Sequence, residues 1–140
     1  VDRAIHLASG PELLDHCGLL VGGRTGSARI TPGFALPAKF VIHTVGPVWK
    51  GGQSGEAERL RSCYLESFRL AEESSIKSIA FPAISTGVYG YPSIQAASIA
   101  TQTMLENESK FDVIIACCFN AADVAVYETA LGRKTPAPSD

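Results

Sequence analysis

The residues with the clearest chemical potential form a loop between a predicted strand and a predicted helix. This loop runs from Phe81 to Pro92 and contains Ser85, Thr86, Gly87 and Gly90. The first N–H groups of a helix lack internal partners, and the helix dipole favours negative charge there. Gly87 and Gly90 can adopt positive φ and let a ligand approach the backbone, while the two hydroxyls add donors. The pattern predicts a phosphate-binding loop, although an ordinary strand–helix connection also contains glycines.

Three further side chains could take part in chemistry. Asp2 precedes a helical pattern over Arg3 to Ala8, so it could serve as the helix N-cap as well as a functional carboxylate. His43 lies in an apolar run and is expected to be a hydrogen-bonded core histidine more often than a catalytic one. Phe119, at the end of another apolar run, could stack on a base or sugar, or be a core aromatic.

The cysteines and histidines do not form a metal-binding pattern. None of the four cysteines forms a C-x-x-C pair, and the three histidines are scattered. We therefore expect buried, reduced cysteines in a cytoplasmic protein, rather than disulfides or a zinc site. The cysteines are Cys17, Cys63, Cys117 and Cys118, and the histidines are His6, His16 and His43.

Composition narrows the functional classes. A chain of 140 residues with 46% hydrophobic and 19% charged residues suits one globular domain. Its net charge of −2 suggests no basic face, so nucleic acid is not an expected partner. No apolar run approaches the ~18 residues that span a bilayer, and the chain opens without a signal-peptide pattern, so no membrane association is expected.

The periodicity of apolar residues predicts alternating strands and helices. The strands are expected at 27–31, 39–45, 77–81 and 111–119, and the helices at 3–8, 12–20, 56–74, 92–105 and from 124 to Gly132. The runs at 39–45 and 111–119 are nearly continuous, which is typical of strands buried on both faces. Three successive strand–helix units predict a mainly parallel sheet with helices on both faces. Ligands bind at the carboxyl ends of such strands, here 43–47, 82–90 and 119–123.

Several segments in combination resemble the macrodomain family, most closely its MacroD-type hydrolases. They are Val1 to His6, Gly10 to Leu14, Leu36 to Lys39, Val41 to Pro47, and Phe81 to Pro92. The resemblance covers nearly the whole chain except the C-terminal tail. It implies an α/β fold of three layers, α/β/α, with a mixed, mainly parallel central sheet.

The resemblance also implies a site. The position of Asp2 is the catalytic acid/base or substrate-orienting residue in that family, and the loop from Ser85 to Tyr89 wraps the diphosphate and distal ribose. Tyr89 would lie against that ribose, and Phe119 would border the adenine. No metal and no cofactor are implied. The implied substrate-binding residues are Val1, Asp2, Ser85, Thr86, Gly87, Val88, Tyr89 and Phe119.

The implied activity is hydrolysis of ADP-ribose esters. Family members of this type remove ADP-ribose from acidic side chains and deacetylate O-acetyl-ADP-ribose. The expected partners are therefore ADP-ribose, O-acetyl-ADP-ribose and mono-ADP-ribosylated proteins, and a monomer is expected. Two alternatives stay open: a non-catalytic reader that binds ADP-ribose on modified proteins, and a scaffold fragment with an incomplete site.

The sequence departs from the family pattern in two places. Arg3 follows Asp2 where the family continues with glycine, and its long cationic side chain could narrow the site or hold the diphosphate. The family's first strands and asparagine-containing motif have no counterpart before Val1, so we expect more sequence in front. The predicted organisation is an N-terminally incomplete macrodomain over 1–132 and a flexible tail over 133–140.

Overall fold

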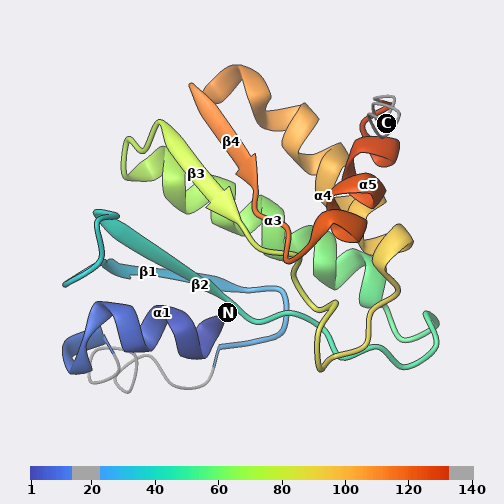
Figure 1. Cartoon of the computed structure of the whole chain (residues 1–140), viewed down its shortest axis with the longest axis horizontal. Coiled ribbons are helices and arrows are strands. Elements are labelled where there is room, and N and C mark those ends of the chain that lie inside the picture. Colours follow the sequence, from blue (N-terminus) through green and yellow to red (C-terminus); the bar gives the residue numbers. More distant parts are fainter. Residues whose placement is uncertain (14–22, 133–140) are drawn as a thin grey trace, which may run out of the picture.

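The computed structural model describes residues 1–13 and 23–132, which form an α/β fold (Figure 1). The elements are α1 (Asp2–Ser9), β1 (Ala28–Pro32), β2 (Phe40–Thr44), α3 (Glu56–Glu73), β3 (Ser78–Phe81), α4 (Ser93–Asn107), a 3₁₀ turn η1 (Glu108–Lys110), β4 (Val113–Ala116) and α5 (Ala121–Ala130). These bounds confirm the helices predicted at 56–74 and 92–105. Most of the helix expected at 12–20, and the tail at 133–140, lie outside the described residues.

The four described strands form two separate pairs. β1 and β2 are antiparallel, with Ala28 opposite Thr44, whereas β3 and β4 are parallel, with Phe81 opposite Ala116. A short connection joins β1 to β2, and a short connection permits only antiparallel pairing. A helix separates β3 from β4, as a parallel crossover requires. Strand pairing is therefore mixed, and the parallel part is confined to β3 and β4.

The β1–β2 pair lies between helices. Successive side chains of a strand point to opposite faces, so His43 and Ile42 face different layers. His43 faces α1, where its ring centroid lies 6.3 Å from that of His6. Ile42 packs against the buried core to which α3 contributes. Figure 1 shows α1 alongside this pair and α3 behind β3 and β4, and α3 also contacts β1 and β2. The arrangement matches the predicted order of helix, sheet and helix.

The core is centred on the apolar face of α3. Leu60, Tyr64 and Phe68 recur at helical spacing and are almost fully buried. The Phe68 ring centroid lies 5.1 Å from that of Phe81 on β3 and 5.3 Å from that of Phe111, just before β4. Tilted aromatic pairs at this spacing add stabilisation beyond their buried area. These rings therefore hold β3 and β4 against α3.

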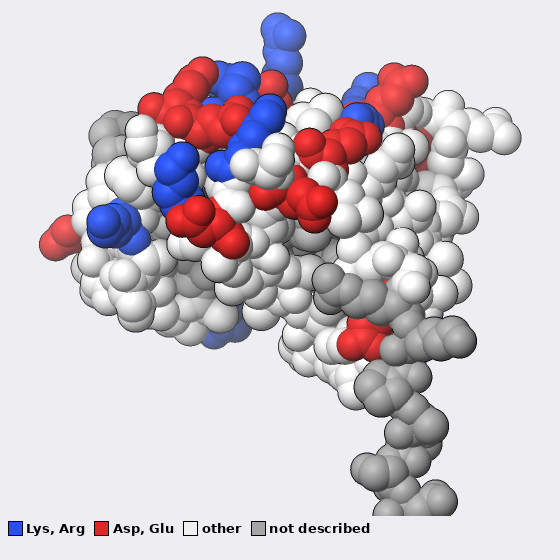
Figure 2. All heavy atoms as spheres, turned by 90° about the horizontal axis from the view of Figure 1, so that it is seen from above, with Lys and Arg blue, Asp and Glu red and all other residues white. Residues whose placement is uncertain are grey.

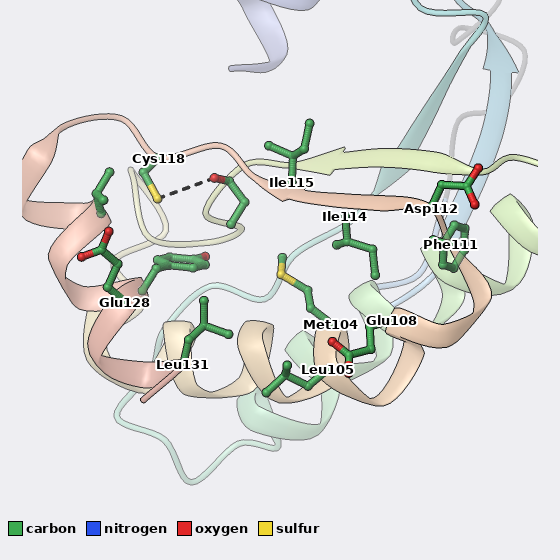
Figure 3. A pocket seen from close by; sticks show the side chains of 13 residues that line it. Met104, Leu105, Glu108, Phe111, Asp112, Ile114, Ile115, Cys118, Glu128 and Leu131 are labelled. Carbon is green, nitrogen blue, oxygen red and sulfur yellow. Dashed lines mark hydrogen bonds between the residues drawn. The ribbon is translucent and has the colours of Figure 1, made fainter. Parts of the chain in front are cut away.

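The expectation that two strands are buried on both faces is wrong. Figure 3 shows Ile114 of β4 directed towards Met104 and Ile115 directed away from it. Ile115 is 50% exposed and Val113 47% exposed. The reason is that β4 belongs to a two-stranded sheet and packs against α4 with the face that carries Ile114, whereas the face that carries Val113 and Ile115 is largely open. In β2, Phe40 is 42% exposed, so that strand is not fully buried either.

The expectation of uniformly buried cysteines is also wrong. Cys63 is buried, whereas Cys117 is exposed and Cys118 is partly buried. The predicted strand at 111–119 ends at Ala116, so both residues lie in the following loop. Cys17 falls outside the described residues.

Charged side chains of both signs are interspersed on the surface (Figure 2). On the polar face of α3, Arg69 pairs with Glu66 at 2.7 Å and with Glu73 at 2.8 Å. Arg61 of α3 pairs with Glu106 of α4 at 2.7 Å. Such exposed pairs contribute little stability individually, and they indicate a solvated helix face. Within residues 1–13 and 23–132, no helix combines the length and hydrophobicity needed to cross a membrane.

Replacing Phe68 by alanine should lower the free energy of unfolding by about 3–5 kcal/mol, because it leaves a cavity between α3, Phe81 and Phe111. Urea denaturation of both forms measures this change. Phe119→Ala is the matched control, since Phe119 is 91% exposed and its loss should change stability by less than about 0.5 kcal/mol. Equal effects of the two substitutions would contradict this account of the core.

Candidate functional site

The loop after β3 combines backbone strain with an unsatisfied polar group. Ser85 has a φ of 66°, in the left-handed region that non-glycine residues rarely adopt. Its Oγ is buried, and no described residue forms a hydrogen bond with it. Strain and unpaired buried groups each cost free energy and tend to occur at functional sites. Ser85 is therefore the residue of this loop whose backbone strain and unpaired hydroxyl most clearly indicate a ligand-binding role.

The other loop residues differ partly from prediction. Thr86 Oγ1 lies 2.9 Å from the Ala83 carbonyl, to which it donates, so its proton is already used within the loop. Gly90 has the predicted positive φ, at 73°, but Gly87 does not. Ser85 takes the left-handed position instead. Gly87 is exposed, and a Cβ built on it would meet nothing within 4 Å, so space for a ligand is present at its backbone.

The loop leads directly into α4. Its outer residues are accessible: Val88 is fully exposed and Tyr89 is 45% exposed. Pro92 is the N-cap of α4, one position before the first-turn place predicted for it, because its ψ of 127° is extended. The N–H of Tyr91 donates to the Ser85 carbonyl at 2.9 Å and closes the loop. Ser85 to Tyr89 are thus held between the end of β3 and a helix N-terminus.

The close contact between Gly46 and Ser85 was not predicted from the sequence. A Cβ at this position would overlap Ser85 Oγ and approach Ile84 Cγ2 to 2.9 Å. Only glycine therefore lets the segment after β2 pass so close to the loop. The sequence placed Gly46 in the strand end 43–47, where a ligand was expected, but its contact with Ser85 joins segments far apart in the chain and has no local signal.

Asp2 lies in the first turn of α1 rather than at its N-cap. Val1 is the N-cap residue and is 71% exposed, and no side-chain capping bond forms there. The alternative that Asp2 is simply a cap is therefore wrong. The Asp2 side chain is 86% exposed, and its Oδ1 lies 3.4 Å from His6 Nε2. The carboxylate is accessible to water and to substrate.

A cavity of about 180 Å³ lies beside Asp2. It is lined by Asp2, His6, Gly23, Ser27, Arg29, His43 and Val45. His43 Nε2 is 3.0 Å from Thr31 Oγ1, as expected for a hydrogen-bonded histidine. Val45 lines this cavity and Gly46 adjoins Ser85, so the end of β2 connects Asp2 with the loop. Figure 1 agrees, with the N-terminus beside the end of β2.

Phe119 follows the strand next to the loop. Because β3 and β4 are parallel neighbours, their carboxyl ends lie side by side, and the Cys117 N–H donates to the Phe81 carbonyl at 2.7 Å. Phe119 is 91% exposed, so the alternative that it is a core aromatic is wrong. An exposed ring at this edge is available for stacking on a ligand.

Two cysteine thiols are poorly suited to nucleophilic catalysis. Burial raises the pKa of Cys63, and burial together with the nearby Asp123 and Cys117 raises the pKa of Cys118. A raised pKa leaves little thiolate at neutral pH. Within the described ranges, no cluster of three or more His, Cys, Asp or Glu residues could hold a metal ion. Among the side chains that line the smaller cavity, Asp2 supplies a carboxylate, and His6 and His43 supply imidazoles.

A larger cavity lies elsewhere (Figure 3). It measures about 590 Å³ and lies between α4, β4 and α5, with Met104, Ile114 and Tyr127 among its lining residues. None of the predicted site residues lines it. Most of its lining residues are apolar side chains, and none comes from the Ser85–Tyr89 loop for which phosphate binding was predicted. We therefore place the candidate site at the strand ends, despite the smaller cavity there.

Comparisons with known proteins agree with this fold. A Macro domain-containing protein of Ralstonia nicotianae is 57% identical over 133 residues, which cover 95% of this chain and 78% of that protein. The ADP-ribose glycohydrolase MACROD2 of Homo sapiens is 48% identical over 138 residues, or 95% of this chain and 32% of that protein.

Solved macrodomain structures are also similar to this chain. The Oceanobacillus iheyensis macrodomain with ADP has a TM-score of 0.88 at 40% identity, covering 94% of this chain and 74% of that one. The Trypanosoma brucei macrodomain in complex with ADP-ribose has a TM-score of 0.84 at 38% identity, covering 94% and 56%. The α/β macrodomain fold expected from the sequence is confirmed. Since the Macro domain family model matches residues 1–100, the chain belongs to the Macro domain family.

Proposed function

We propose that this chain binds ADP-ribose and hydrolyses mono-ADP-ribose esters on acidic side chains of proteins, and that it also deacetylates O-acetyl-ADP-ribose. The observation that carries the proposal is the buried, unpartnered hydroxyl of Ser85 in a strained loop at the N-terminus of α4. Diphosphate oxygens would accept hydrogen bonds from this hydroxyl and from the first N–H groups of the helix. Relatives solved with ADP and with ADP-ribose, and relatives named ADP-ribose glycohydrolase, support this ligand.

The remaining site residues have assigned roles in the proposal. Gly87 and Val88 present their backbone to the diphosphate, and Tyr89 lies against the distal ribose. Phe119, exposed at the neighbouring strand end, borders the adenine. Val1 and Asp2 lie beside the ester. The protein substrate would approach from solvent, because both are largely exposed.

Asp2 would supply the chemistry. An ionised carboxylate can orient or deprotonate a water molecule, which typically contributes ~10²–10⁴-fold. The water adds across the ester bond, and the products are ADP-ribose, a free carboxylate on the protein and one proton. The Ser85–Tyr89 loop would fix the sugar relative to that water, so it contributes proximity rather than bond making.

A reader function without catalysis is the second candidate. Arg3 follows Asp2 in α1 and is exposed, so its guanidinium could pair with a phosphate of the ligand and favour binding without turnover. Both candidates use the same loop, and only turnover distinguishes them.

Asp2→Ala should leave the dissociation constant of ADP-ribose within about tenfold of wild type and reduce turnover by ~10² or more, because the carboxylate acts on water rather than on binding. The assay measures free ADP-ribose released from a glutamate-ADP-ribosylated protein. Asp112→Ala, at an exposed position beside the larger cavity, is the control and should retain full turnover. Undiminished release by Asp2→Ala would refute the assignment. ADP-ribose binding without release by wild type would establish the reader.

Gly87→Val should weaken ADP-ribose binding at least tenfold, because the new side chain occupies the space that the diphosphate needs. Gly87 does not have a positive φ, and its Cβ position is open, so the melting temperature should stay within a few degrees of wild type. Calorimetric titration with ADP-ribose measures the affinity. An unchanged dissociation constant would refute the phosphate-binding role of this loop.

A further inference from the structure

The carboxylate of Glu56 organises a neighbouring loop. Glu56 is the first residue of α3 and is only 1% exposed. Its Oε2 accepts the N–H of Lys50 at 3.0 Å and of Gly52 at 2.7 Å, and its Oε1 accepts the N–H of Ser54 at 2.6 Å. One buried side chain therefore binds three backbone donors of the segment 50–54.

This carboxylate stays charged at neutral pH. Desolvation raises the pKa of Glu56, but the backbone hydrogen bonds from Lys50, Gly52 and Ser54 outweigh it, and the pKa lies below its ordinary value of 4.5. Its contribution to stability is then complete above that value and is lost as the pH falls through the lowered pKa. Its place in the first turn of α3 also suits a negative charge.

The 50–54 loop supports Trp49. A Cβ built on Gly52 would lie 2.7 Å from Trp49 Cη2, so the indole packs directly on the Gly52 backbone. The indole also contacts Tyr91, with ring centroids 4.7 Å apart and planes at 54°. The backbone N–H of Trp49 donates to the Tyr89 carbonyl at 2.9 Å. Trp49 thus joins the 50–54 loop to the end of the candidate phosphate-binding loop.

The contacts continue to Ser85. Tyr91 is only 3% exposed, and its N–H donates to the Ser85 carbonyl at 2.9 Å. Burial raises the pKa of Tyr91, and the charge of Glu56 raises it further. Glu56, Trp49, Tyr91 and Ser85 therefore form a continuous route of packed and hydrogen-bonded groups.

We propose that Glu56 is a positioning residue for the ADP-ribose site: by holding the 50–54 loop it seats Trp49 against Tyr91 and so fixes Tyr89 and Ser85 before the ligand arrives. This inference rests on the proposed function. A preorganised loop loses less conformational freedom on binding, which raises affinity without any contact between Glu56 and the ligand.

Glu56→Gln tests the inference, because it keeps the shape but replaces one acceptor oxygen by an NH₂ group that opposes the backbone donors. ADP-ribose affinity should fall about tenfold, while the variant remains folded by circular dichroism. Trp49 is the only tryptophan in the sequence, so its fluorescence reports the loop directly. Its emission should shift to longer wavelength as the indole loses its support.

Glu58→Gln is the matched control, because Glu58 lies in the same first turn but is exposed. It should change neither affinity nor emission. If wild type fails to bind ADP-ribose, the proposed function is wrong, and emission alone then decides the inference. Identical Trp49 emission in Glu56→Gln and wild type, or full affinity in a folded Glu56→Gln variant, would overturn it.

Two neighbouring glycines provide a test that does not depend on Glu56. Gly51 and Gly52 both have positive φ, at 94° and 88°, so alanine introduces similar backbone strain at either position. Only the Cβ at Gly52 would press on Trp49, since that at Gly51 meets nothing within 4 Å. Gly52→Ala should therefore weaken ADP-ribose binding at least fivefold more than Gly51→Ala. Equal affinities would overturn the route through Trp49.

Discussion

The burial of the apolar face of α3 is the constraint on which the rest of the structure depends. Tyr64 and Phe68 lie against Phe81, and Phe68 also meets Phe111, so this helix holds the parallel pair β3–β4. The same helix contacts β1, β2 and α4. Both strand pairs pack on one helix, so the positions of their carboxyl ends relative to one another are fixed. The loops that follow these strand ends are therefore also held close together.

At those strand ends, packing holds Ser85 in a conformation that costs free energy. The left-handed backbone of Ser85 costs of order 1–3 kcal/mol, and a buried hydroxyl without a partner costs about as much. The close passage of Gly46 and the hydrogen bond from Tyr91 hold Ser85 in place. Under the proposed function, a diphosphate oxygen would accept a hydrogen bond from this hydroxyl and so remove the cost of leaving it unpaired. The buried hydroxyl of Ser85 would then lack a hydrogen-bond partner in the free protein and gain one in the complex, which favours ligand binding.

Family membership establishes the fold of the chain, whereas local geometry supports the roles proposed for individual residues. The match to the Macro domain family over residues 1–100 establishes the fold, and it agrees with the resemblance found in the segments around Asp2 and Phe81 to Pro92. The structure adds what a family pattern does not contain: an accessible Asp2 beside His6, an exposed Phe119, and a route from Glu56 to the loop. These are properties of this chain, and they are what the proposed roles depend on.

The sequence by itself determined the helices at 56–74 and 92–105 and the position of the candidate loop between β3 and α4. The spacing of Leu60, Tyr64 and Phe68 defined α3 because helical periodicity is local. Gly10, with a φ of 86°, ends α1 and lies between the helices predicted at 3–8 and 12–20. Tertiary structure alone decided the exposure of Val113 and the left-handed backbone at Ser85 rather than Gly87. Each of these depends on contacts between segments far apart in the chain, and local hydrophobic spacing carries no information about such contacts.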